Sequence, residues 1–300
     1  MLSPGHVTFK AKSPPLPLSL LESHQVLAVA GPDAEAFLQA QLMNDVRLLA
    51  PGQWHWSGWL SAKGRVIALM ALVRTAPDRF LMVLPDFPAD EMRMRLQRYV
   101  FRSKLVLAVP GWRCAAQFDD VEAVPGEEDR ARGSDAEGWR LDMGSAAARR
   151  ALWLLPPESG HASPSSPADA ERWLDLDLAH GLPRLPAEGV EAWTPQMLSL
   201  ERLRAFSLKK GCYPGQEIVA RTHFLGKAKR GLLRLAGDAL AVGQALRDAA
   251  GNELGVVACV DARGVQAQAV ATLDAEGAEL NVNGRHVDVL ALEPGLARPL

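Results

Sequence analysis

Cysteine is scarce in this chain of 300 residues. The three cysteines are Cys114, Cys212 and Cys259, and no two of them form a CxxC pair. An odd, widely spaced set excludes a disulfide framework, and it excludes a zinc or cluster site built from these cysteines alone. We therefore expect a protein of a reducing, cytoplasmic compartment.

Long apolar runs are missing as well. No stretch approaches the roughly 20 apolar residues that a membrane-spanning helix needs, so no membrane association is expected. The N-terminal segment is interrupted by Lys10, Lys12, Pro14, Pro15 and Pro17, and it therefore lacks the apolar core of a secretory signal. We predict that residues 1–18 form a flexible leader.

Neither sign of charge is in excess. The 33 basic and 35 acidic residues give a net charge of −2, which leaves no broad basic face for direct contact with nucleic acid. The seven histidines show no HExxH or similar ligand spacing, so we predict no metal site within the chain. The proportions of apolar and charged residues are those of an ordinary globular protein, and the length suits two or three packed units.

Apolar spacing predicts a mixture of helices and strands. Helical spacing occurs at 34–42, 86–99 and 170–179, whereas 66–73 and 80–84 form a predicted hairpin. The basic side of the 86–99 helix is either a solvated face or a binding patch, and a solvated face is the more frequent case. Residues 117–167 carry weaker signals, which predict a seam between subdomains. Beyond residue 230, short alternating segments and an Asn283-Gly284 turn predict a separate barrel or sandwich.

The densest group of unusual residues is KKGCYPGQEIVAR, from Lys209 to Arg221. Nearby lysines favour the thiolate form of Cys212, and the Pro-Gly pair after it predicts a bend that exposes the thiol. Burial as a small apolar residue is the alternative for this cysteine. Glu217 suits either chemistry or the first turn of a helix. Arg221 could hold a carboxylate such as a glutamate tail, although a solvated surface position is more common for arginine.

Eight tryptophans account for much of the small aromatic content. Trp173 lies on the predicted 170–179 helix, where its ring could stack against a planar heterocycle. Filling the core is the alternative, and it explains most tryptophans without a ligand.

Several ordered segments of the chain resemble the YgfZ family of folate-binding proteins. The segments are GPDAEAFLQAQLMNDV at 31–46, AKGRV at 62–66, LQRYVFRSKL at 96–105, GLP at 181–183, TPQMLSL at 194–200 and the segment around Cys212. The resemblance implies the α+β fold of the glycine cleavage T-protein, with intertwined ferredoxin-like subdomains around a central folate pocket and a C-terminal β-barrel. It divides the chain into the leader 1–18, a core at 19–229 and a barrel at 230–300.

The resemblance also implies a function. Members of the family are expected to bind tetrahydrofolate or a derivative, and to assemble or repair iron–sulfur clusters for enzymes such as those that thiolate tRNA. The partners would be iron–sulfur enzymes or assembly proteins. The alternative is a folate-dependent one-carbon transferase related to aminomethyltransferase. Conventional turnover is not expected, because the stretch from Val66 to Met70 is apolar and lacks the carboxylate that orients the amine in those enzymes.

Site residues follow from the resemblance position by position. Cys212 is the signature cysteine of the family, and Trp173 takes the place of a folate-contacting tryptophan. His24 stands where the family has a second pocket tryptophan. Ala179 replaces the glutamate of an EAG triplet, and His180 beside it is a candidate substitute for the lost carboxylate. Around the cysteine, the matching motif residues are Lys210, Gly211, Tyr213, Gly215, Gln216 and Glu217.

Overall fold

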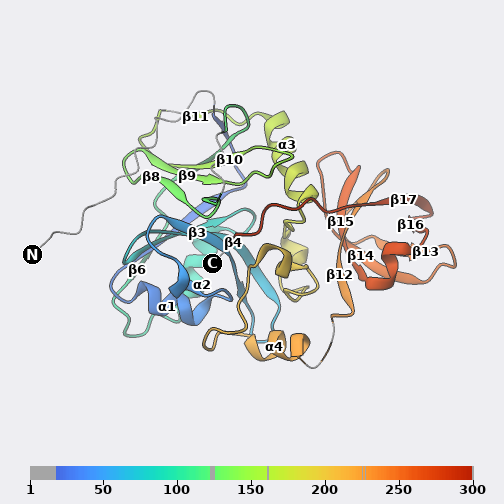
Figure 1. Cartoon of the computed structure of the whole chain (residues 1–300), viewed down its shortest axis with the longest axis horizontal. Helices are drawn as coiled ribbons and strands as arrows, with labels where there is room; N and C mark the ends of the chain where they lie inside the picture. Colours follow the sequence, from blue (N-terminus) through green and yellow to red (C-terminus); the bar gives the residue numbers. More distant parts are fainter. Residues whose placement is uncertain (1–17, 122–125, 161, 225, 227, 299–300) are drawn as a thin grey trace, which may run out of the picture.

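A computed structural model describes residues 18–121, 126–160, 162–224, 226 and 228–298. Two sheets, four α-helices and a barrel make up this part of the chain (Figure 1). The predicted leader, apart from Leu18, lies outside the described residues.

The five-stranded sheet has the order β3-β4-β5-β2-β6. Its strands are β2 (Gln25–Ala30), β3 (Gln53–Leu60), β4 (Val66–Ala76), β5 (Arg79–Leu84) and β6 (Val106–Ala108). The helices α1 (Ala34–Gln41) and α2 (Ala89–Gln97) pack on one face of it. Strand β4 is apolar at successive positions because both faces of the sheet are buried, with Met70 toward the helices and Ala71 toward the second sheet. The predicted hairpin of β4 and β5 is confirmed.

The second sheet has six strands in the order β11-β1-β7-β10-β9-β8. They are β1 (Leu18–Leu20), β7 (Arg113–Gln117), β8 (Ala131–Ser134), β9 (Gly138–Asp142), β10 (Ala151–Leu155) and β11 (Ala162–Ser163). Its inner face packs on the five-stranded sheet, where Leu152 and Leu154 join Trp54 and Trp56 in one core. The expectation of a weak seam at 117–167 is therefore wrong for 131–155, which supplies three strands of this sheet, of which β9 and β10 are largely buried.

Helix α3 (Pro167–Ala179) lies between the six-stranded sheet and the barrel (Figure 1). Ser166 caps its N-terminus by accepting a hydrogen bond from the Asp169 N–H, and Pro167 occupies the first helical position. Helix α4 (Gln216–Phe224) begins directly after the turn that follows Cys212. Gln216 and Glu217 thus start a helix, which was one of the two predictions for them.

The closed barrel has the order β12-β15-β14-β13-β16-β17. Its strands are β12 (Arg230–Ala236), β13 (Ala245–Asp248), β14 (Glu253–Val260), β15 (Gln266–Thr272), β16 (Leu280–Val282) and β17 (Arg285–Leu290). Asn283 and Gly284 both have positive φ and form the tight turn between β16 and β17, which confirms the predicted hairpin.

The chain leaves the barrel after Leu290 and runs back to the middle of the molecule (Figure 1). We call residues 291–298 the C-terminal strap. Leu296 is buried in the core shared by the two sheets, and the backbone N–H of Glu293 donates to the carbonyl oxygen of Ala179 at 2.8 Å. The last segment of the chain therefore packs against the sheets, away from the barrel that precedes it.

Candidate functional site

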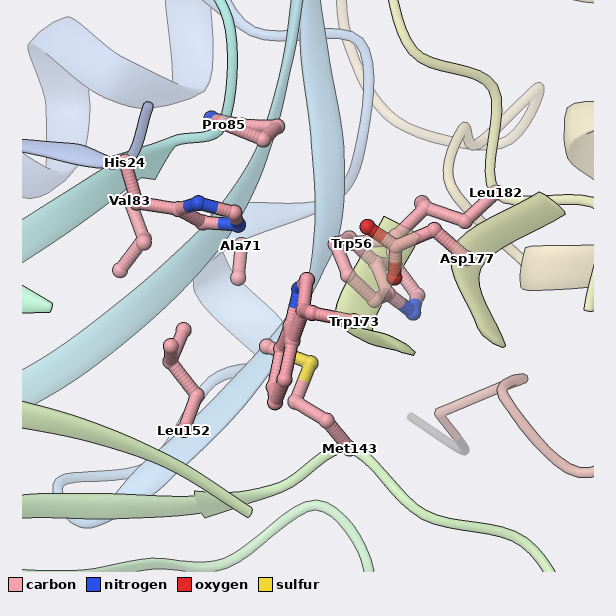
Figure 2. A pocket seen from close by; sticks show the side chains of 10 residues that line it. All are labelled: His24, Trp56, Ala71, Val83, Pro85, Met143, Leu152, Trp173, Asp177 and Leu182. Atoms are coloured by element: carbon pink, nitrogen blue, oxygen red, sulfur yellow. The ribbon is translucent and has the colours of Figure 1, made fainter. Parts of the chain in front are cut away.

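Trp173 and Asp177 are one helical turn apart on the buried face of α3. The Trp173 ring is almost fully buried, and its centroid lies 6.0 Å from that of the His24 imidazole, which meets it edge-on. The structure thus brings together two of the predicted folate-binding residues, which lie far apart in the sequence. Figure 2 shows the His24 and Asp177 side chains directed toward the space beside Trp173.

A buried arginine fixes the helix and the tryptophan ring. The guanidinium carbon of Arg150 stands 4.3 Å from the centroid of the Trp173 ring, and its Nη1 donates to the Trp173 carbonyl oxygen at 2.9 Å. Its Nη2 lies 2.7 Å from the Asp177 carboxylate, and both side chains are fully buried. Such a pair is stable only when other hydrogen bonds compensate the lost hydration, as the one from Arg150 Nε to the Met143 carbonyl oxygen does here.

Two further side chains, Arg184 and Asp86, extend this ion pair. Asp177 also lies 3.4 Å from Nη1 of Arg184, which in turn binds the Asp86 carboxylate through two nitrogens. Two arginines and two aspartates thus form a chain with no net charge. Burial, together with these two cations, lowers the pKa of His24 well below its ordinary value, so the imidazole is neutral at pH 7.

The space between these side chains is a small cavity lined by buried residues. Its walls come from both sheets and from α3, and about 10 Å³ of it is open to the centre of a water molecule, which is room for one water. The indole Nε1 of Trp173 is buried without a hydrogen-bond partner among the described residues. Buried donors of this kind cost free energy unless a water or a ligand atom accepts from them. The lining residues are His24, Trp56, Ala71, Val83, Pro85, Met143, Leu152, Trp173, Asp177 and Leu182.

The C-terminal strap covers this region of the core. The indole Nε1 of Trp56, a lining residue, donates to the Leu296 carbonyl oxygen at 2.8 Å. The Arg298 guanidinium carbon lies 4.7 Å from the centroid of the Trp54 ring, and its Nη2 donates to the Asp142 carbonyl oxygen at 2.5 Å. Strap residues therefore contact strands of both sheets next to the cavity.

Lys210 is an anchor of the segment around Cys212. Its ammonium donates to the carbonyl oxygens of Leu42 and Asn44 at 2.5 and 2.8 Å, and burial lowers its pKa to about 8. The ammonium also stands 5.1 Å from the centroid of the Tyr213 ring, which is buried in the core. One of the two lysine charges that were expected to favour the thiolate is thus bound to backbone carbonyls.

Cys212 itself is exposed, so the alternative that it is a buried apolar residue is wrong. That alternative describes Cys114 and Cys259, since burial raises the pKa of each of these thiols to about 12. The bend after Cys212 depends on Gly215, which has φ +77°. A Cβ atom there would lie 2.6 Å from the Gly64 Cα atom, so only glycine lets the two turns pack together.

Asn44 connects the two regions. Its side-chain amide donates to the carbonyl oxygens of Trp56 and Arg204 at 2.8 Å, while its own carbonyl oxygen accepts from Lys210. The segment that carries the thiol is thereby attached to the strand whose Trp56 lines the cavity.

Other predicted residues lie elsewhere. Arg221 lines a surface hollow on α4 together with Glu217 and Phe224, and the structure does not bring it to Trp173. His180 caps the C-terminus of α3, and its Nδ1 lies 2.7 Å from the Leu176 carbonyl oxygen; it is buried but does not line the cavity.

Sequence reasoning missed Asp177, Arg150 and Asn44. An aspartate four residues after Trp173, on the apolar side of a predicted helix, was a usable signal for Asp177. Nothing local marks Arg150, because its partners lie on a segment that is distant in the sequence.

The described part of the chain lacks membrane-spanning helices and metal-binding clusters. No helix there is both long enough and apolar enough to cross a membrane. Within the same residues, no cluster of three or more histidine, cysteine or carboxylate side chains is arranged to bind a metal ion.

The chain resembles known proteins both in sequence and in fold. The tRNA-modifying protein YgfZ of Cronobacter sakazakii is 30% identical over 250 residues, which cover 78% of this chain and 76% of that protein. The tRNA-modifying protein YgfZ of Edwardsiella ictaluri is 30% identical over 243 residues, covering 75% and 72%. No protein family model matches the chain.

A solved structure shows the same fold. It is the glycine cleavage system aminomethyltransferase T from Bartonella henselae, which aligns with a TM-score of 0.71 over 92% of this chain and 85% of that one. At 19% sequence identity this similarity concerns the fold alone. It confirms the predicted T-protein-like architecture of α+β core and C-terminal barrel.

Proposed function

The chain belongs to the YgfZ family, and from this premise we propose that it binds a reduced folate beside Trp173 and supports iron–sulfur cluster assembly or repair through Cys212. The ligand would be tetrahydrofolate or a derivative, and the enzymes served would include those that thiolate tRNA. The name of the curated relatives, tRNA-modifying protein, supports the connection with tRNA. The name of the structural neighbour, an aminomethyltransferase, supports the connection with folate.

The observation that carries the folate proposal is the unpaired Nε1 of Trp173 at the wall of the cavity. A pterin is a flat heterocycle that offers acceptor atoms and an amino-amide edge with donors. The cavity wall offers an aromatic side chain, an unused donor and the Asp177 carboxylate, which is an acceptor. The side chains therefore match the chemistry of the ligand, whereas the volume does not, so the lining must move when the ligand enters.

Asp177 and His24 would form different hydrogen bonds with the ligand. The carboxylate of Asp177 accepts hydrogen bonds, and the neutral imidazole of His24 can either donate or accept one. A bound reduced folate would supply the capacity to carry a one-carbon unit. Strand β4 begins with buried apolar residues and provides no carboxylate to orient an amine, so the proposal includes no aminomethyl transfer.

Cys212 would act at the surface rather than in the cavity. Its exposure lets a partner reach the thiol, whereas the two other thiols are buried. A thiolate could bind a cluster together with ligands of the partner, or accept an adduct.

The test is a comparison of Trp173→Phe and Cys212→Ser. Tetrahydrofolate should raise the melting temperature of the native chain and of the Cys212→Ser chain by mass action, and the shift should be largely lost in Trp173→Phe. Trp153→Phe is the matched control, because Trp153 is equally buried but its Nε1 already donates to Gln117. In cells that lack their own member of the family, the native chain should restore tRNA thiolation and the Cys212→Ser chain should not.

Either half of the proposal can fail independently. An unchanged melting temperature in the native chain at saturating tetrahydrofolate would reject the folate site. Full thiolation with Cys212→Ser would reject the role of the thiol.

A further inference from the structure

A groove of about 620 Å³ lies beside the segment that carries Cys212. Its floor is the buried end of β3 and the start of β4, one wall is the C-terminal end of α2, and Pro214 and Glu191 complete the lining. We infer that this groove is the docking site for an acidic segment of a partner protein, one that also carries apolar side chains. The groove itself is independent of the folate proposal, and only the meaning of the nearby thiol depends on the proposed function.

The groove and the thiol are held together by backbone packing. Gly215 sits directly against the turn between β3 and β4, where a Cβ atom would meet the Ser61 carbonyl oxygen at 2.6 Å. Pro214, which precedes it, lines the groove, and Cys212 is two residues further back. A partner seated in the groove would therefore lie next to the exposed thiol.

The segment that supplies the α2 wall carries exposed side chains of interface character. Tyr99 lines the groove itself, and Met94 and Phe101 lie within two residues of lining residues in the sequence. Phe101, Met94 and Tyr99 are 85%, 56% and 53% exposed, although each is large and apolar or aromatic. The Tyr99 ring meets Trp59 edge-on with centroids 6.4 Å apart, and Arg102 lies 5.2 Å from the centroid of the Phe101 ring. Aromatic, methionine and arginine side chains are the types enriched where proteins bind one another.

The charge of this surface selects an acidic partner. Residues 89–104 contain five basic and two acidic side chains, a local net charge of +3 in a chain with a net charge of −2. Arg93 and Arg95 form ion pairs with acids of their own helix, as expected for a solvated face. Arg98 and Arg102 form no ion pair with any described residue, and Arg98 lines the groove. These two arginines can attract carboxylates of a partner.

A protein fits this surface better than RNA does. The floor is formed by the apolar side chains of Trp59, Leu60 and Ile67, and Glu191 places a carboxylate within the groove. A phosphate backbone needs a longer basic track, and the carboxylate would repel it. A partner segment would instead place an apolar side chain on the floor, and the acidic residues beside it would pair with the arginines at the rim.

Site-specific cross-linking tests the inference. The full chain with Tyr99→p-benzoylphenylalanine would be produced in a bacterial host in place of the host's own member of the family. The living cells would then be irradiated. We expect a cross-link to one protein, through a peptide rich in Asp, Glu and apolar residues. Adding Arg98→Glu or Phe101→Ala should lower the yield about tenfold, the effect of removing one strong interface contact.

Matched variants identify non-specific effects. Phe224→Ala removes an exposed phenylalanine from α4, and Arg285→Glu reverses an exposed charge on the barrel, so neither should lower the yield. Tetrahydrofolate-induced thermal shifts of the same proteins report separately on the folate site. Cross-links mainly to RNA, no cross-link, or a yield that Arg98→Glu and Phe101→Ala leave unchanged would each overturn the inference.

Discussion

Lys210 and Cys212 are near neighbours with opposite environments. The Pro-Gly pair after Cys212 predicted a bend that exposes the thiol, with burial as the alternative, and the cysteine is exposed. The sequence did not predict that the ammonium of Lys210 turns inward to two carbonyl oxygens. A lysine can place its charge several ångströms from its backbone, so its target depends on tertiary contacts that the neighbouring residues do not specify.

We expect Lys210→Met to lower the free energy of unfolding by about 1–3 kcal/mol at pH 7, since it leaves the Leu42 and Asn44 carbonyl oxygens without their donor. Denaturant unfolding measures this. Lys209→Met is the control, because Lys209 is exposed and should change stability by less than about 0.5 kcal/mol.

The stability difference between the native chain and Lys210→Met should also depend on pH. The pKa of Lys210 is about 8 in the folded chain and about 10.4 when unfolded, so between these values the unfolded chain binds the extra proton. The native chain therefore gains up to about 1.4 kcal/mol per pH unit relative to the variant as the pH rises from 8 to 10. The comparison cancels the opposing contribution of the buried cysteines. A difference that is constant over this range would contradict the buried ammonium.

Elements with a regular apolar pattern or a local turn signal were predictable, and strands that lack both were not. The β4–β5 hairpin, helix α3 and the Asn283-Gly284 turn follow from spacing and turn chemistry within one segment. Strand β10 is only five residues long, apolar on both faces, and pairs with β7 across more than thirty residues of sequence. Its partner, and hence its place in a sheet, depends on chain topology rather than on local preference.

The candidate site likewise contains residues that the sequence could predict and residues that it could not. Trp173 and His24 came from a family resemblance, and they do line one cavity. The Arg150–Asp177 pair joins a loop-bounded strand end to a helix, and no periodic pattern encodes such a contact. Arg221 was placed with Trp173 on chemical grounds alone, and the structure puts it on a different surface.

Helix α3 provides a test of the buried ion pair within one element. Asp177→Asn removes the charge that compensates Arg150, so we expect a loss of about 3–5 kcal/mol in the free energy of unfolding. Asp175→Asn is the control on the same helix. Asp175 pairs with the half-exposed Arg263, and such pairs contribute at most about 1 kcal/mol. Equal losses in the two variants, measured by urea unfolding, would show that the Arg150 pair has no special role.

At the scale of the whole molecule, the C-terminal strap joins the barrel to the two sheets. Its contacts fall on Trp54 and Trp56 of one sheet, on Asp142 of the other and on the end of α3. Because the strap is continuous with the last barrel strand, its attachment couples the stability of the barrel to that of the core.

Arg298→Ala should weaken this coupling. The variant loses the contact with Trp54 and the hydrogen bond to the Asp142 carbonyl oxygen, at a cost of about 1–3 kcal/mol. We expect faster proteolysis within 291–298 and a red-shifted tryptophan emission, because water then reaches Trp54 and Trp56. If the strap also limits entry to the cavity, tetrahydrofolate should associate faster with Arg298→Ala than with the native chain. Arg285 is an exposed arginine of the barrel, so Arg285→Ala should leave the rates of proteolysis and of tetrahydrofolate association unchanged. If Arg298→Ala has the same proteolysis rate and tryptophan emission as the native chain, the strap is held in place without Arg298.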